Sequence, residues 1–154
     1  MRIAVGADHA GFPLKAPAIA ELKSLGHDVQ DLGTDSTEAV DYPDYAQAVA
    51  EAVMRGDADR GLLLCGSGVG ACVAANKVPG VRAATCHDTF SAHQGVEDDD
   101  ANVLCMGARV VGENLALEII RAWDGARFSN AERHRRRLGK VNAIETQYLR
   151  KPTD

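Results

Sequence analysis

Residues 61–70 have the sequence GLLLCGSGVG, an apolar run that ends at Cys65 and leads into alternating glycines. An unbroken apolar run of this length is typical of a central strand in a parallel sheet covered on both faces. The glycines allow a tight turn, and the residues after them favour a short helix that Pro79 ends. This order of strand, turn and helix predicts an α/β fold.

The same alternation continues on both sides of this segment. Further apolar, strand-like runs lie at residues 2–6, 27–32, 81–86 and 102–106. Apolar residues at helical spacing predict helices between the strands, including a short one around residues 89–94. Strands that alternate with helices form right-handed βαβ units. We therefore expect a Rossmann-like three-layer α/β/α sandwich with a five-stranded, mostly parallel sheet.

Length and composition limit the class of protein. With 154 residues, 45% of them hydrophobic and 25% charged, the chain fits one domain with its own core. We expect a single domain over residues 1–154, with a charged helix from about 130 to 149 that packs on a partner subunit. The net charge of −5 argues against binding to nucleic acid or to an anionic membrane. Without a leader-like segment or an apolar stretch near ~20 residues, the protein is expected to be cytoplasmic.

The glycine turn after Cys65 has the features of an anion site. Alternating glycines can point several backbone N–H groups into one concavity, and the following helix adds partial positive charge. An unperturbed thiol, with a pKa of about 8.5, is only slightly ionised near neutrality, and this field favours its thiolate. A base beside an oxyanion site can remove a proton next to a carbonyl. The alternative is a tight turn with a buried, inert thiol.

A dinucleotide site is a rival interpretation of the same turn. Gly66, Gly68 and Ala71 match the pattern G-x-G-x-x-A, and Asp88 lies near the end of the following strand. However, the motif follows the third predicted strand instead of the first, and the helix after it is short. The chain also offers little room for a dinucleotide and a substrate together. We therefore expect no nucleotide cofactor.

Two more groups of residues are candidates for binding a ligand. Asp8 and His9 follow the first strand, at the edge where parallel sheets bind ligands, and could bind sugar hydroxyls or phosphate. The alternative is that Asp8 caps a helix and His9 lies on the surface. Arg133 and Arg137 are one helical turn apart, so both could bind one phosphate. The alternative for these arginines is a solvated helix face.

Neither the acidic run nor the cysteines predict a metal site. The run Glu97–Asp100 suggests Mg²⁺, but consecutive carboxylates in an extended loop rarely point at one ion, and the calcium-loop pattern is absent. The four cysteines include no CxxC pair for zinc. Cys86 and Cys105 lie in apolar runs and are expected to be small core residues. We therefore expect no metal.

Taken together, the motifs resemble the type B ribose 5-phosphate isomerase family, which also contains the galactose 6-phosphate isomerases. The resemblance covers about residues 3–145. The motifs that carry it are GADHAG at 6–11, DYP at 41–43, CGSGVG at 65–70, AANK at 74–77, NVL at 102–104, GAR at 107–109 and RH at 133–134.

The resemblance implies an aldose–ketose isomerase without a cofactor, acting first of all on ribose 5-phosphate and ribulose 5-phosphate. It also implies a dimer or tetramer whose active sites are shared between subunits. Cys65 would move a proton between C1 and C2 through an enediolate, because the glutamate base of another family branch would align with Ala71 here. The other implied residues are Ser67 in catalysis, the amides of Gly66, Gly68, Val69 and Gly70 at the enediolate, Asp8 and Tyr42 at the sugar, and His9, Arg133 and Arg137 at the phosphate, with Arg109 reaching in from the neighbouring subunit.

One departure from the family concerns the sugar ring. Members usually carry His-Asn or His-Asp where this chain has Asp98-Asp99, and that histidine opens the ring as a general acid. We place Asp98 in the catalytic set and Asp99 in the binding set. An unperturbed aspartate, with a pKa of about 3.9, donates protons poorly near neutrality. Ring opening is then either lost or not needed.

The departure leaves several substrates open. A tetrose 4-phosphate cannot close a furanose ring, because the oxygen required for closure is esterified, so it would tolerate Asp98. The same chemistry on a hexose 6-phosphate is another alternative. A sugar-phosphate-binding protein without catalysis is the alternative from a different functional class.

Overall fold

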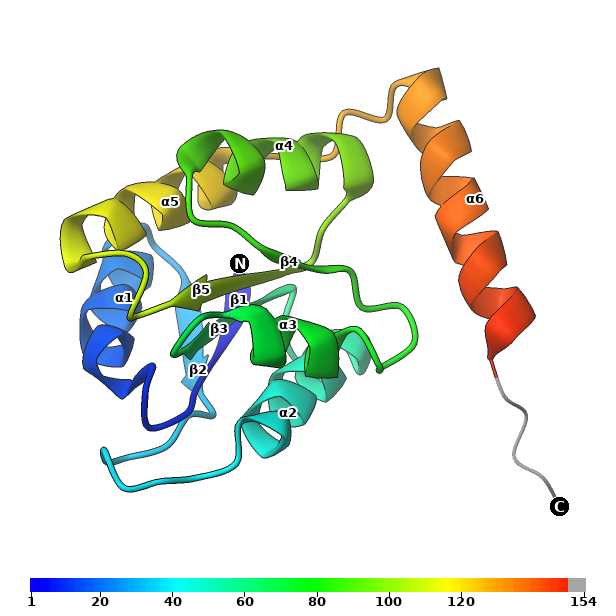
Figure 1. Cartoon of the computed structure of the whole chain (residues 1–154). Helices are drawn as coiled ribbons and strands as arrows, with labels where there is room; N and C mark the ends of the chain where they lie inside the picture. Colours follow the sequence, from blue (N-terminus) through cyan, green and yellow to red (C-terminus); the bar gives the residue numbers. More distant parts are fainter. Residues whose placement is uncertain (150–154) are drawn as a thin grey trace, which may run out of the picture.

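The computed structural model describes residues 1–149, which form one five-stranded sheet with helices on both sides (Figure 1). The strands are β1 (Arg2–Ala7), β2 (Asp28–Asp31), β3 (Arg60–Cys65), β4 (Ala83–Thr85) and β5 (Val103–Gly107). Their order is β2-β1-β3-β5-β4, and every pairing between neighbours is parallel. The expected α/β/α sandwich is confirmed, with a sheet that is fully instead of mostly parallel.

Two apolar layers cover the sheet, and alternate residues of each strand face opposite layers. The first layer is built by α1 (Phe12–Ser24), α4 (Thr89–Asp99) and α5 (Glu113–Gly125), and the second by α2 (Tyr42–Met54) and α3 (Val69–Ala75). In the central strand β3, Leu62 and Leu64 pack into the first layer, whereas Leu63 and Cys65 pack into the second. Burial from both sides explains why residues 61–65 are apolar throughout.

Helix α4 is longer than the sequence predicted. It begins where the Asp88 carboxylate accepts a hydrogen bond from the Ser91 N–H at 2.7 Å. It ends where Asp100 adopts a left-handed conformation, with φ of 50°. Residues 97–99 therefore form the last helical turn, and the expectation that the acidic run lies in an extended loop is wrong. Strand β4, at the edge of the sheet, is shorter than the predicted 81–86.

The charged C-terminal helix predicted at 130–149 is confirmed as α6 (Glu132–Tyr148). It contacts α4 and stands at the right of Figure 1, away from the loop that joins β3 to α3. Val141, Ile144 and Tyr148 on this helix are exposed. Among the helices of residues 1–149, none combines the length and apolar character that crossing a bilayer requires.

Candidate active site

The direction of the sheet sorts the predicted site residues into two groups. Residues that follow a parallel strand lie at the carboxyl edge of the sheet, and residues that precede a strand lie at the amino edge. The carboxyl-edge group consists of Asp8, His9, Tyr42, the loop Cys65–Gly70 and Arg109. The amino-edge group consists of Asp98, Asp99, Arg133 and Arg137, which lie on α4 and α6.

Cys65 ends β3 and lies against the glycine loop. The backbone N–H of Gly68 donates a hydrogen bond to the Cys65 sulfur at 2.9 Å. Gly68 has a φ of 80°, a left-handed conformation that favours glycine and turns this N–H toward the sulfur. A hydrogen bond to a charged sulfur stabilises the thiolate. The side chain is only 4% exposed in a single chain, so a substrate can meet just a small part of it.

Two of the backbone amides that the sequence assigned to the enediolate already donate hydrogen bonds within the loop. Gly68 donates to the Cys65 sulfur, and the Val69 N–H donates to the Ser67 hydroxyl oxygen at 3.2 Å. Ser67 is exposed beside the buried thiol. The Gly70 backbone touches Tyr42, since a Cβ atom built on Gly70 would lie 2.8 Å from the Tyr42 ring. The structure therefore brings Tyr42, Ser67 and Cys65 together around one loop.

Arg109 lies beside the glycine loop of its own chain. It follows β5, which pairs directly with β3, and its N–H donates to the Gly66 carbonyl at 3.0 Å. The guanidinium lies 3.3 Å from the place where a Cβ atom on Gly66 would be. Neighbouring strands thus bring Arg109 beside Gly66 within one chain, and the expectation that Arg109 reaches in from a neighbouring subunit stays a prediction.

His9 and Arg109 line one hollow of about 460 Å³ at the carboxyl edge. His9 Nδ1 accepts a hydrogen bond from the Val40 N–H at 3.2 Å, which leaves Nε2 to carry the hydrogen in a neutral ring. Both side chains suit a phosphate group. Cys65 is not among the residues that line this hollow.

Asp8 has a structural role at the start of α1. One of its carboxylate oxygens accepts hydrogen bonds from the N–H groups of Ala10 and Gly11, each at 2.9 Å. These bonds close the turn before α1, whose N-cap is Gly11 without a side-chain cap, so the alternative that Asp8 caps the helix is wrong. The second carboxylate oxygen is left for a ligand. Asp8 is 7% exposed, so a ligand would have to approach it closely.

Asp98 is already paired within the amino-edge group. One oxygen lies 3.4 Å from Nε2 of His134, and the other accepts a hydrogen bond from Gln94 at 3.2 Å. His134 is buried, and its Nδ1 lies 2.6 Å from the Ser129 hydroxyl. Arg133 and Arg137 are exposed on α6, and neither forms an ion pair with any residue of 1–149. Asp99 is also exposed. Within one chain, these residues do not meet Cys65.

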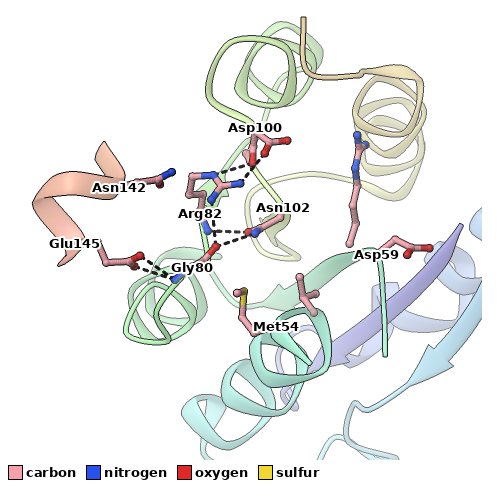
Figure 2. A pocket seen from close by; sticks show the side chains of 11 residues that line it. Met54, Asp59, Gly80, Arg82, Asp100, Asn102, Asn142 and Glu145 are labelled. Atoms are coloured by element: carbon pink, nitrogen blue, oxygen red, sulfur yellow. Dashed lines mark hydrogen bonds and ion pairs between the residues drawn. The ribbon is translucent and has the colours of Figure 1, made fainter. Parts of the chain in front are cut away.

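A second hollow, of about 510 Å³, lies at the amino edge beneath α6 (Figure 2). Its charged side chains already have partners within the described residues. Arg82 contacts the Asp100 carboxylate at 2.8 Å, and Glu145 on α6 accepts hydrogen bonds from the Gly80 N–H at 3.0 and 3.1 Å. These bonds tie α6 to the body of the protein. Across residues 1–149, no three His, Cys, Asp or Glu side chains are grouped so as to hold a metal ion.

A second thiol near the loop escaped the sequence analysis. A hydrogen bond from the Cys105 thiol, helped by Thr85 and Asn76, lowers the pKa of Cys72 on α3 to about 6 against the cost of burial. Burial raises the pKa of Cys86 to about 11. Cys86 and Cys105 are buried, which confirms their predicted place in the core. The spacing of the cysteines in the sequence could not show that Cys72 on α3 faces the buried Cys105 thiol of β5.

Asn76 braces the edge strand. Its amide donates to the Ala83 carbonyl and accepts from the Ala83 N–H, both at 2.9 Å. The side chain thus pairs with β4 as a neighbouring strand would. Through this contact, the motif AANK at residues 74–77 supports the edge strand β4.

Comparisons with known proteins agree with this arrangement. Ribose-5-phosphate isomerase B of Escherichia coli is 47% identical over 144 residues, 94% of this chain and 96% of the relative. A D-erythrulose-4-phosphate isomerase of Pectobacterium atrosepticum is 47% identical over 129 residues, 83% of this chain and 85% of the relative. The solved structure of Clostridium thermocellum ribose-5-phosphate isomerase B superimposes with a TM-score of 0.93 at 48% identity, covering 96% of this chain and 99% of that one.

The fold, the loop after β3 and these matches define the class as a sugar-phosphate isomerase, an enzyme that interconverts an aldose and a ketose. A family model described as Ribose/Galactose Isomerase matches residues 3–141. The chain belongs to this family.

Cys72 is expected to react with a small alkylating reagent before Cys86 and Cys105, because a half-buried thiol with a pKa of about 6 is mostly ionised at neutral pH. Mass spectrometry after brief treatment with iodoacetamide should show Cys72 modified before Cys86 and Cys105. The rate at Cys72 should be half-maximal near pH 6. A half-maximum above about pH 8, the value for an ordinary thiol, would contradict this assignment. The variant Cys72→Ser should lose the fast phase.

Proposed function

We propose that the enzyme moves a proton between C1 and C2 of an aldose phosphate and its ketose, ribose 5-phosphate in the first place, with the Cys65 thiolate as the base. The observation that carries this proposal is the hydrogen bond from the Gly68 N–H to the Cys65 sulfur at 2.9 Å. It places the sulfur of the proposed base against the loop whose remaining amides, at Gly66 and Gly70, would face the enediolate.

The proton balance needs no cofactor. The thiolate removes the proton from C2 of the open-chain aldose, and the electron pair moves toward the carbonyl oxygen to form an enediolate. The thiol then returns the proton to C1, while the hydroxyl proton passes between O2 and O1, giving the ketose and the thiolate. Ser67, exposed beside Cys65, supports the enediolate oxygen through its hydroxyl, which accepts a hydrogen bond from the Val69 N–H.

The substrate would lie across the carboxyl edge. His9 and Arg109, which line the same hollow, are placed to bind the phosphate. The free oxygen of Asp8 and the Tyr42 hydroxyl would bind the sugar. Tyr42 is 43% exposed with its ring against Gly70, so its hydroxyl is accessible next to the loop.

We place the amino-edge group of a second copy over this edge to complete the site. Arg133 and Arg137 are two exposed cations one helical turn apart, and their chain offers no carboxylate partner among residues 1–149. The exposed apolar residues Val141, Ile144 and Tyr148 on the same helix suit a contact with another subunit. In a dimer, helix α6 of one copy would then bring both arginines to the phosphate bound by the other.

A tetrose 4-phosphate is the second candidate substrate, and Asp98 favours it. One carboxylate oxygen accepts a hydrogen bond from Gln94 and the other lies 3.4 Å from His134 Nε2, so both oxygens already have partners within the chain. A substrate that cannot form a ring needs no proton donor at this position. The similarity to a D-erythrulose-4-phosphate isomerase supports this candidate.

The variant Cys65→Ala is expected to lose at least about 100-fold in kcat, because the proton then has no base. Its affinity for the sugar phosphate, measured by calorimetry, should change little. In D₂O the wild type should place deuterium on C1 of the ketose, and the variant should not. Cys72→Ala is the matched control and should keep exchange. Exchange that persists in Cys65→Ala would contradict the proposed base, and wild-type binding without any exchange would indicate a binding protein.

Assays of erythrose 4-phosphate and ribose 5-phosphate side by side decide between the two candidates. If Asp98 excludes ring opening, kcat/KM should favour the tetrose, and Asp98→His should raise kcat/KM for ribose 5-phosphate roughly tenfold or more. The same variant should change the value for the tetrose by less than about twofold. Asp98→Asn, which removes the charge without adding an acid, is the control. Wild-type preference for ribose 5-phosphate would reject the tetrose and leave the first candidate.

A further inference from the structure

The end of the edge strand β4 touches the support of the glycine loop at two points. The Thr85 hydroxyl donates a hydrogen bond to the Gly68 carbonyl at 3.2 Å. His87, which follows β4 after Cys86, accepts a hydrogen bond at Nε2 from the Gly107 N–H at 2.9 Å. Neither side chain belongs to the proposed binding residues. Both bonds end on backbone groups that surround Cys65.

Gly107 lies directly opposite the thiol and directly beneath the loop. In the pairing of β3 with β5, Cys65 is the register partner of Gly107. A Cβ atom built on Gly107 would lie 2.5 Å from the Ser67 carbonyl carbon and 2.7 Å from the Gly66 oxygen. The two backbones are therefore in contact without an intervening side chain, so a shift of Gly107 would shift Ser67 as well.

Gly68 is also in close backbone contact with β5. A Cβ atom on Gly68 would lie 3.0 Å from the Met106 carbonyl carbon and 3.2 Å from the Gly107 nitrogen. The Gly68 carbonyl accepts both the Thr85 hydroxyl and the Cys72 N–H of α3, the latter at 3.1 Å. Its own N–H donates to the Cys65 sulfur at 2.9 Å. The direction of that N–H depends on where the rest of the residue is fixed.

We propose that Thr85 and His87 are positioning residues that keep the Gly68 N–H aimed at the Cys65 sulfur. Thr85 fixes the far side of Gly68, and His87 fixes the Gly107 backbone on which Ser67 and Gly68 rest. Neither touches the substrate, so both act through the loop. This inference rests on the proposed role of Cys65 as the base.

The hydrogen bond between Gly107 and His87 also defines the tautomer of the His87 imidazole. Gly107 supplies the hydrogen, so Nε2 must be the acceptor and the ring must be neutral with its own hydrogen on Nδ1. A glutamine at this position could present its amide oxygen near the place of Nε2, whereas leucine could not accept a hydrogen bond. At position 85, serine keeps the hydroxyl, and valine keeps the shape without it.

Steady-state kinetics on these two matched pairs test the inference. Thr85→Val and His87→Leu should lower kcat roughly tenfold, less than the loss of a direct oxyanion donor, because the loop is loosened and not removed. KM should stay within about twofold, since the phosphate and sugar contacts are untouched. Thr85→Ser and His87→Gln should restore most of the wild-type kcat. A merely structural role would affect both members of each pair alike, or would change KM as well.

The outcomes separate this inference from the proposed function. Wild-type kcat in both Thr85→Val and His87→Leu, alongside an inactive Cys65→Ala, would overturn the positioning role alone. An equal loss in Thr85→Ser and Thr85→Val, or in His87→Gln and His87→Leu, would overturn it too. An active Cys65→Ala would overturn the proposed base first. Circular dichroism checks folding, and if Thr85→Val does not fold, the His87 pair decides by the same criteria.

Discussion

All five strands of the sheet run in the same direction, and this common direction determines which residues meet. Because every pairing is parallel, each strand ends at the same edge, and the residues that follow β1, β3 and β5 come together there. The thiol, the glycine loop, His9 and Arg109 gather at this edge without being close in sequence. Asp98 precedes β5 and therefore lies at the opposite edge, beside helix α6, which contacts α4 and carries Arg133 and Arg137.

The strands β5 and β4, which carry no residue of the proposed catalytic set, support the loop around the Cys65 thiol. Cys65 lies between the carboxyl end of β3 and a loop whose backbone rests on Met106 and Gly107 of the adjacent strand. Strand β4, with Asn76 paired along it, closes the edge behind the loop. The small residues at 66, 68 and 107 allow backbones to approach each other at distances that any side chain would prevent. Rigid backing of this kind lets a single N–H stay aimed at one sulfur atom.

Much of the fold was predictable from the sequence because burial on both faces leaves a strong pattern. The apolar runs at β1, β3 and β5 gave these strands, and the glycines marked the loop. The length of α4 was missed because its second half, from Gly95 to Asp99, is polar and has few apolar residues to mark a buried face. Helix α6 was found from its charge pattern, although it buries only His134.

The grouping of the carboxyl-edge candidates could be predicted from their place after the strands, but their geometry could not. The order β2-β1-β3-β5-β4 cannot be obtained from the spacing of apolar residues, and this order decides that Arg109 meets Gly66 of its own chain. The contacts of Thr85 and His87 depend on the same order, since β4 and β3 both flank β5. The low pKa of Cys72 arises from a thiol on a distant strand, which no local pattern records.

We propose that a single chain holds half of the working site. Mixed dimers in which one subunit carries Cys65→Ala and the other Arg137→Ala, purified through two different tags, test this proposal. Each parent protein should be nearly inactive at low substrate concentration, whereas the mixed dimer should regain about half of the wild-type kcat/KM, because one of its two sites is intact. Mixed dimers of Arg133→Ala with Arg137→Ala are the control and should regain none. A mixed Cys65→Ala and Arg137→Ala dimer no more active than its parents, or a chain that stays monomeric while fully active, would contradict the account.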